Sequence, residues 1–134
     1  GTYSISSADE LAKLAKMTNA GLIGKNTEFV LANDIDLSAY SSGAGWTPIG
    51  NKTNAFQGTF DGNGYIVSNL YINNPNGEGA LFWGNFSAKI KNLGLENINV
   101  SAKNATGLIN VANSIYNCYV TGDVESLMQD GHLV

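Results

Sequence analysis

Three aspartates carry the groups in this sequence that could do chemistry. Asp34 and Asp36 are two residues apart in a predicted strand, so their side chains share one face, and Asp61 lies in a turn sequence further on. A carboxylate cluster of this kind could bind calcium or act as acid and base on a glycosidic bond. The chain has no arginine, and no lysine adjoins the pair, whereas a polysaccharide lyase also needs a basic residue. We therefore expect no enzyme activity, no catalytic residue and no cofactor, with a metal site at Asp34 and Asp36 as the weaker alternative.

Aromatic side chains are the second group of interest, because they can stack on sugar rings or pair with each other on a sheet. Tyr71 and Tyr119 occupy the same outward position in the first and third copies of a repeated phrase, and Gly94 has that position in the second copy. Together with Trp83, they are the positions through which we predict carbohydrate binding. The alternative is that these rings only stabilise the sheet surface.

The elements that must position these side chains are encoded by one short phrase, which occurs at residues 67–72, 90–95 and 115–120. Each copy reads aliphatic, spacer, Asn, apolar, spacer, aliphatic. The copies begin 23 and 25 residues apart, which is a period typical of solenoid proteins. Stacking the copies aligns three apolar columns: Val67, Ile90 and Ile115; Leu70, Leu93 and Cys118; Ile72, Leu95 and Val120.

Each Asn in the phrase is expected to form a corner. Strict alternation would point Leu93 outward although Leu95 and Ile90 also need the core, and a bend at Asn92 removes this conflict. Asn suits such a corner, since it tolerates left-handed backbone. Asn69, Asn92 and Asn117 should then stack in a ladder of amide hydrogen bonds. A second aligned corner is predicted five residues later, at Asn74, Asn97 and Gly122.

The predicted fold is all-β: a right-handed parallel β-helix of about 4–5 short coils, with a β-sandwich as the alternative. One helix is predicted over residues 7–18, because Ser7 and Glu10 match a capping box and an apolar stripe follows. We interpret this helix as a cap over the end of the stack. The whole chain, 1–134, is read as one domain, with repeats over 29–124 and a tail or truncated further repeat over 125–134.

Composition excludes several classes of function. The 134 residues carry a net charge of −4, with seven lysines and no arginine, so we expect no nucleic-acid partner. No apolar run approaches the roughly 20 residues that a membrane span needs. The single cysteine, Cys118, excludes an intrachain disulfide and falls in an apolar column, so it is predicted to be buried and inert.

Several motifs together resemble the GLUG-repeat proteins, a group related to filamentous-haemagglutinin-type β-helices. The resemblance covers residues 29–124, and its specific parts are Trp-Thr-Pro-Ile-Gly at 46–50, Phe-x-Gly-Thr-Phe-Asp-Gly-Asn-Gly at 56–64, the phrase at 90–95 and Asn-Cys-Tyr-Val-Thr-Gly at 117–122. By this resemblance Trp46 belongs to the core. Trp83 stands where the family's Gly-Leu-apolar-Gly tetrapeptide has glycine, which makes it the better surface candidate.

The resemblance implies a bacterial secreted or cell-surface protein, in which such repeats serve as stalks, adhesive modules or spacers. It carries over no catalytic residue. We therefore predict a non-enzymatic structural or adhesion module, with carbohydrate or a host or cell-surface protein as partner. The alternative is a polysaccharide-acting β-helix enzyme, either a lyase or a glycosidase.

The far end of the stack is predicted to be a contact surface. No element comparable to the helix follows Val124, so strand edges and apolar side chains are left uncovered there. We expect this end either to form an end-to-end homodimer or to continue into further repeats.

Overall fold

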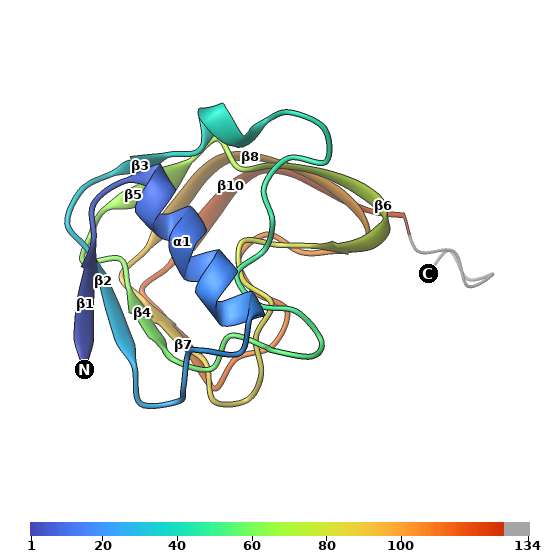
Figure 1. Cartoon of the computed structure of the whole chain (residues 1–134). Helices are drawn as coiled ribbons and strands as arrows, with labels where there is room; N and C mark the ends of the chain where they lie inside the picture. The colour runs from blue at the N-terminus through green and yellow to red at the C-terminus, as the bar shows by residue number, and fades with distance from the viewer. Residues whose placement is uncertain (128–134) are drawn as a thin grey trace.

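The chain folds mainly into parallel β-strands with one α-helix, as shown by the computed structural model, which describes residues 1–127 (Figure 1). The strands form two sheets, in each of which neighbouring strands come from successive passages of the chain. All strand pairs in the described residues are parallel; the antiparallel contact is an isolated bridge between Gly45 and Ile72. The β-sandwich alternative, which needs antiparallel sheets, is therefore wrong.

The chain alternates between the two sheets. Within the described residues the first sheet contains β1 (Thr2–Ile5), β2 (Glu28–Leu31), β4 (Thr59–Asp61), β7 (Lys89–Lys91) and β9 (Ser114–Tyr116). The second sheet contains β3 (Ile35–Asp36), β5 (Ile66–Ser68), β8 (Gly94–Ala105) and β10 (Tyr119–Ser126), and β6 (Tyr71–Gly79) also pairs with β8. Isolated parallel bridges join Ile49 to Phe82 and Phe82 to Ile109 on the return path. Glu125 and Ser126 belong to β10, so the strand extends into the predicted tail; residues 128–134 of that tail lie outside the described part.

Columns of apolar side chains run through the stack from one passage to the next. In the first sheet Phe29, Phe60, Ile90 and Ile115 are register partners. In the second sheet the columns are Ile35, Val67, Leu95 and Val120, and then Ile72, Val100 and Val124. Strands in a sheet lie about 4.8 Å apart, so each side chain contacts its partners above and below. A fully buried side chain of this size contributes roughly 1.5–3 kcal/mol.

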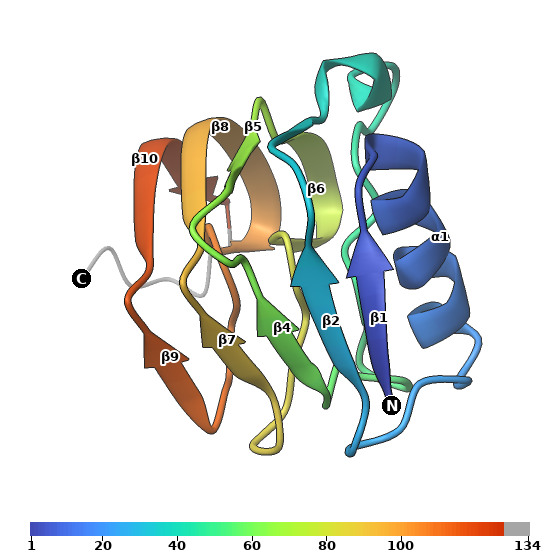
Figure 2. The same ribbon diagram turned by 90° about the vertical axis from the view of Figure 1, so that its left-hand side faces the viewer.

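The helix α1 (Ala8–Asn19) lies beside β1, at the N-terminal side of the stack (Figure 2). The predicted helix differs from it by one residue at each end. Ser7 is the N-cap and accepts a hydrogen bond from the Glu10 amide at 3.1 Å, while the Glu10 carboxylate accepts from the Ser6 amide at 2.7 Å. Leu11 and Leu14 are buried in the core. The short 3-10 helix η1 (Ser38–Tyr40) follows β3.

The first copy of the repeated phrase does not stack as predicted. Val67 pairs with Leu95 instead of Ile90, and the true partner of Ile90 is Phe60. The corner after Phe60 holds two more residues than the corner after Ile90, because six residues lie between Phe60 and Val67 and four lie between Ile90 and Leu95. Both corners of a passage use Asn after an aliphatic residue, so the phrase at 67–72 matched the wrong corner.

Left-handed backbone marks the corners. Positive φ angles occur at five of the six residues expected there: Asn69 (64°), Asn92 (57°), Asn97 (55°), Asn117 (53°) and Gly122 (126°). The prediction for Asn74 is wrong, since this residue lies inside β6. At Gly122 a Cβ would lie 2.3 Å from the Ile98 carbonyl oxygen, so this corner requires glycine.

Side-chain amides connect the corners in two ladders. The sequence predicted a single ladder of Asn69, Asn92 and Asn117. In the first ladder Asn117 Nδ2 donates to Asn92 Oδ1 at 3.0 Å, and Asn92 Nδ2 donates to Asp61 Oδ1 at 3.2 Å. In the second ladder Asn97 Nδ2 donates to Asn69 Oδ1 at 2.8 Å, and Asn69 Nδ2 donates to Asp36 Oδ1 at 2.9 Å. Asn69 therefore stacks on Asn97, and each ladder begins at an aspartate.

Hydrogen bonds lower the pKa of the Asp36 carboxyl from its ordinary value of 3.8. The largest cause is the Ser38 hydroxyl, followed by the Asn69 amide and the Ser38 backbone amide, which donates at 2.9 Å. The folded protein therefore binds a proton at Asp36 more weakly than the unfolded chain does. This carboxylate contributes stability above pH 3.8, and the contribution is lost as the pH falls through the lower folded-state pKa.

Replacing Asn92 with Leu should destabilise the protein although it adds apolar surface. The substitution places a branched side chain at φ 57° and removes both ladder hydrogen bonds, so we expect a loss of about 2–4 kcal/mol. Urea unfolding followed by tryptophan fluorescence measures it. Asn92→Gly, which tolerates the backbone, should lose about half as much. An Asn92→Leu protein as stable as wild type would contradict the role of the corner.

Replacing Asp36 with Asn should make stability less dependent on pH in acid. At pH 7 the variant is expected to unfold at a lower urea concentration than wild type, because the charged acceptor of three hydrogen bonds is gone. Below pH 3.8 wild type loses this advantage, and the two urea midpoints should converge. A difference that stays constant from pH 7 down to pH 2.5 would show that Asp36 is not the titrating group.

Candidate functional site

The three aspartates considered for a catalytic or metal site each accept hydrogen bonds within the fold. Asp34 Oδ1 accepts the Ile66 amide at 2.9 Å, and Asp61 Oδ1 accepts the Asn63 amide at 2.8 Å in addition to the ladder bond. Asp36 accepts the Ser38 and Asn69 donors described above. Within residues 1–127 no group of three or more His, Cys, Asp or Glu side chains is arranged to hold a metal ion. Each of the three carboxylates therefore accepts at least one backbone amide.

Tyr71 and Tyr119 do not occupy the same position in the stack, contrary to the prediction from the repeated phrase. Tyr119 is the register partner of Gly94, whereas Tyr71 pairs with Asn99, which lies beyond the Asn97 corner of the same strand. The two tyrosines therefore face different sides of the stack. The Tyr119 hydroxyl donates to the Glu96 carboxylate, and this hydrogen bond raises the pKa of Tyr119.

Trp83 lies on neither of these sides. Its backbone amide donates to the Ile49 carbonyl at 2.9 Å on the return path, and its side chain is half-buried. The structure thus brings none of the three predicted sugar-binding aromatics together. Carbohydrate binding through Trp83, Tyr71 or Tyr119 stays a prediction.

The last described passage presents an apolar surface, which we call the open face: Ile115, Val120 and Val124. These side chains are 54%, 42% and 45% exposed, whereas their column partners Ile90, Leu95 and Val100 are buried. Cys118 is only half-buried, so its predicted full burial is wrong, for the same reason: β9 and β10 each have one strand neighbour in the described part of the chain.

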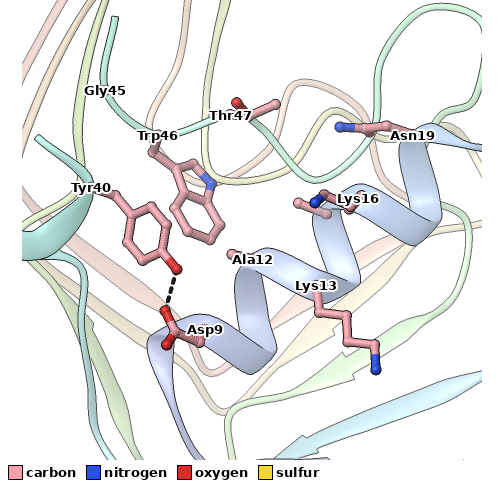
Figure 3. A pocket seen from close by; sticks show the side chains of 10 residues that line it. Asp9, Ala12, Lys13, Lys16, Asn19, Tyr40, Gly45, Trp46 and Thr47 are labelled. Atoms are coloured by element: carbon pink, nitrogen blue, oxygen red, sulfur yellow. Dashed lines mark hydrogen bonds between the residues drawn. The ribbon is translucent and has the colours of Figure 1, made fainter. Parts of the chain in front are cut away.

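A groove of about 550 Å3 lies between α1 and the segment of residues 38–50. We call it the helix groove. Asp9, Ala12, Lys13, Ala15, Lys16 and Asn19 line it from the helix, and Tyr40, Gly45, Trp46 and Thr47 line it from the opposite segment (Figure 3). Its size is in the range of small-molecule sites. No sequence motif indicated it, because its two walls are separated by about thirty residues of chain.

Two side-chain contacts hold the walls of the helix groove at its ends. At one end the Tyr40 hydroxyl donates to the Asp9 carboxylate, which raises the pKa of Tyr40. At the other end Asn19 Nδ2 donates to the Pro48 carbonyl at 3.1 Å, and Asn19 Oδ1 accepts the Gly50 amide at 2.8 Å. These contacts join the two walls of the helix groove at both of its ends.

Trp46 forms the inner wall of the groove. Its side chain is 3% exposed, as expected for a core residue, and its ring meets Tyr40 edge to face with centroids 5.3 Å apart. The indole nitrogen is on the edge of the ring that faces the helix side at Lys16 (Figure 3). No atom of the described residues accepts a hydrogen bond from this buried N–H. Among those residues it is the one buried side-chain donor without an acceptor.

Comparisons with known proteins give two relatives and no family. No protein-family model matches the chain, and no solved structure gives a significant match. The chain is 34% identical over 91 residues to a "Putative Gly-rich membrane protein" of Evansella cellulosilytica, covering 65% of this chain and 10% of that protein. It is 30% identical over 138 aligned positions to "Halomucin" of Haloquadratum walsbyi, covering 94% of this chain and 2% of that protein. The chain thus spans a small part of each curated relative that it matches.

Proposed function

We propose that the chain is a structural module of a secreted or cell-surface protein, built as a right-handed parallel β-helix of the GLUG-repeat type. The observation that carries the proposal is the contrast between the two ends of the stack. Helix α1 buries Leu11 and Leu14 against the core at one end, while Ile115, Val120 and Val124 of the open face are 42–54% exposed at the other. A stack with one covered and one open end suits the start of a stalk or spacer.

The open face has the chemistry of a stacking surface. Its side chains continue columns whose inner members are aliphatic or aromatic, so a further passage of similar sequence would bury them. Asn117, at the end of the first ladder, has a side-chain oxygen that can accept from an Asn one passage further on, as Asn92 does from Asn117. We propose that in the longer protein another repeat occupies this face, and that an end-to-end homodimer is the alternative occupant.

The relatives support a location outside the cytoplasm. One has "membrane protein" in its name and the other contains the word mucin, and both names fit a protein at the cell surface. Both are many times longer than this chain, as a repeat-built stalk would be. In the described residues no helix has the length and apolar character needed to cross a membrane.

A non-enzymatic role goes with this proposal. Asp34, Asp36 and Asp61 accept hydrogen bonds that hold corners, and their replacement would damage the fold before any chemistry. The whole protein's partners, including a host or cell-surface protein, belong to the same proposal.

Duplicating residues 104–127 directly after Leu127 should stabilise the protein. Leu127 donates to the Ala102 carbonyl, so residue 104 follows it in register, and the added passage would cover the open face. We expect unfolding at a higher urea concentration and less binding of a hydrophobic dye such as ANS. A matched duplicate with Ile115→Lys and Val120→Lys in the first copy should gain nothing. Equal stability of the duplicate and the parent chain would refute stacking at this face.

Antibodies raised against this chain should label intact cells of its source organism. A cell-surface stalk is accessible without permeabilisation, and mild external proteolysis should abolish the signal. A cytoplasmic protein serves as the matched control for cell integrity. Labelling that appears only after permeabilisation would contradict the proposed location while leaving the stacking test unaffected.

A further inference from the structure

The indole N–H of Trp46, a buried donor without an acceptor, is the feature of the helix groove that indicates a ligand. A buried donor without an acceptor typically costs about 1–3 kcal/mol, so native proteins leave few of them. Two other polar side chains on the walls have partners: the Tyr40 hydroxyl donates to Asp9, and the Asn19 amide bonds to Pro48 and Gly50. Trp46 Nε1 therefore needs an acceptor that the described part of the chain does not provide.

The alanines of α1 create the space beside Trp46. Ala12 and Ala15 line the groove at the positions where the helix faces the opposite segment, between the two end contacts. Ala12 is half-buried, so a larger side chain would enter the groove instead of solvent. The volume of about 550 Å3 accommodates one or two sugar units or a molecule of similar size.

The polar groups around this space require a ligand that both donates and accepts hydrogen bonds. Trp46 Nε1 and the Lys16 ammonium can only donate, and the Asp9 carboxylate can only accept. Lys16 forms no ion pair within residues 1–127, and its amine lies on the same side of Trp46 as the indole nitrogen, whereas Lys13 points away (Figure 3). Hydroxyl groups fulfil both roles, and the apolar face of a sugar ring suits the wall formed by Tyr40 and the alanines.

We propose that the helix groove binds a short saccharide, with a hydroxyl or ring oxygen accepting from Trp46 Nε1 and another hydroxyl donating to Asp9. Lys16 donates to the same ligand from the helix side. This site is distinct from the aromatic positions that the sequence suggested, since it shares none of Trp83, Tyr71 or Tyr119. It does not depend on the stalk proposal, because α1 and residues 38–50 are at the end opposite the open face.

Indole N–H signals in a 15N–1H correlation spectrum test the proposal directly. The chain has two tryptophans, so two indole signals are expected, and the Trp83→Phe variant assigns them by removing one. The intact chain is titrated with glucose, galactose, mannose, N-acetylglucosamine, maltose, lactose and chitobiose, with sorbitol as an open-chain polyol control. We expect at least one sugar to shift the Trp46 indole signal saturably and to leave the Trp83 signal in place.

Two variants then separate the groove from the rest of the surface. Trp46→Phe keeps the aromatic wall and removes the N–H, so it should bind the same sugar at least about fivefold more weakly. Ala12→Leu fills the groove from the helix and should abolish binding. Trp83→Phe is the matched control, because it makes the same Trp-to-Phe change at a residue outside the groove. Its affinity for the sugar should equal that of wild type. Thermal unfolding checks each fold, and Trp46→Phe should be close to wild type because it removes an unpartnered donor.

Three results would overturn the proposal. The first is that no sugar in the panel moves the Trp46 signal. The second is binding that shifts the Trp83 signal and is lost in Trp83→Phe, which would favour the aromatic positions predicted from the sequence. The third is unchanged affinity in the Ala12→Leu protein, which is informative even where Trp46→Phe fails to fold. None of these outcomes bears on stacking at the open face, so the two proposals fail separately.

Discussion

Left-handed corners are the constraint on which the rest of this structure depends. The chain can line one core from several sides only where it bends sharply between short strands, and an L-residue resists the backbone that such a bend needs by roughly 1–2 kcal/mol. Asn92, Asn97 and Asn117 adopt that backbone, and their side chains recover part of the cost by bonding to the neighbouring passage. Because each amide has one donor group and one acceptor group along the stack, the same residue that turns the chain also fixes the register of the next passage. The apolar columns follow from this register.

Each ladder also has a direction. An Asn at every level can accept from one neighbour and donate to the other, but the first level needs an acceptor without a donor of its own. Asp36 and Asp61 hold these first positions, and each carboxylate additionally binds a backbone amide of its own turn. Two of the three acidic residues that suggested catalysis, Asp36 and Asp61, are therefore the first members of the corner ladders. At the other end the series has no such terminator within the described residues, which agrees with the exposed columns of the open face.

The sequence was sufficient for the local features and insufficient for the pairing of passages. The capping box at Ser7 located α1 to within one residue, and the alternation conflict at Asn92 located a corner, because both signals depend only on neighbouring residues. The stacking of residues 67–72 was predicted wrongly because two corners of one passage require the same residue type, and the extra residues at 63 and 64 change the spacing. The helix groove left no sequence signal, since its walls meet only when α1 packs against residues 38–50. Trp46 was correctly expected in the core, but its unpartnered N–H depends on what surrounds it.

A repeating stack restricts where a specific binding site can arise. At a level inside the stack, each residue has a partner above and below, so corner amides and column side chains are already committed to the fold. The junction of α1 with the first passages is different, because α1 is the one α-helix of the described residues. Side chains there contact a surface that has no copy, and small residues such as Ala12 can be kept without weakening any column. An unpartnered donor such as the Trp46 N–H is therefore expected at this junction, where the surroundings are not repeated, and not at an inner level of the stack. The two proposals, extension at the open face and ligand binding in the helix groove, therefore concern opposite ends of the stack and use no residue in common.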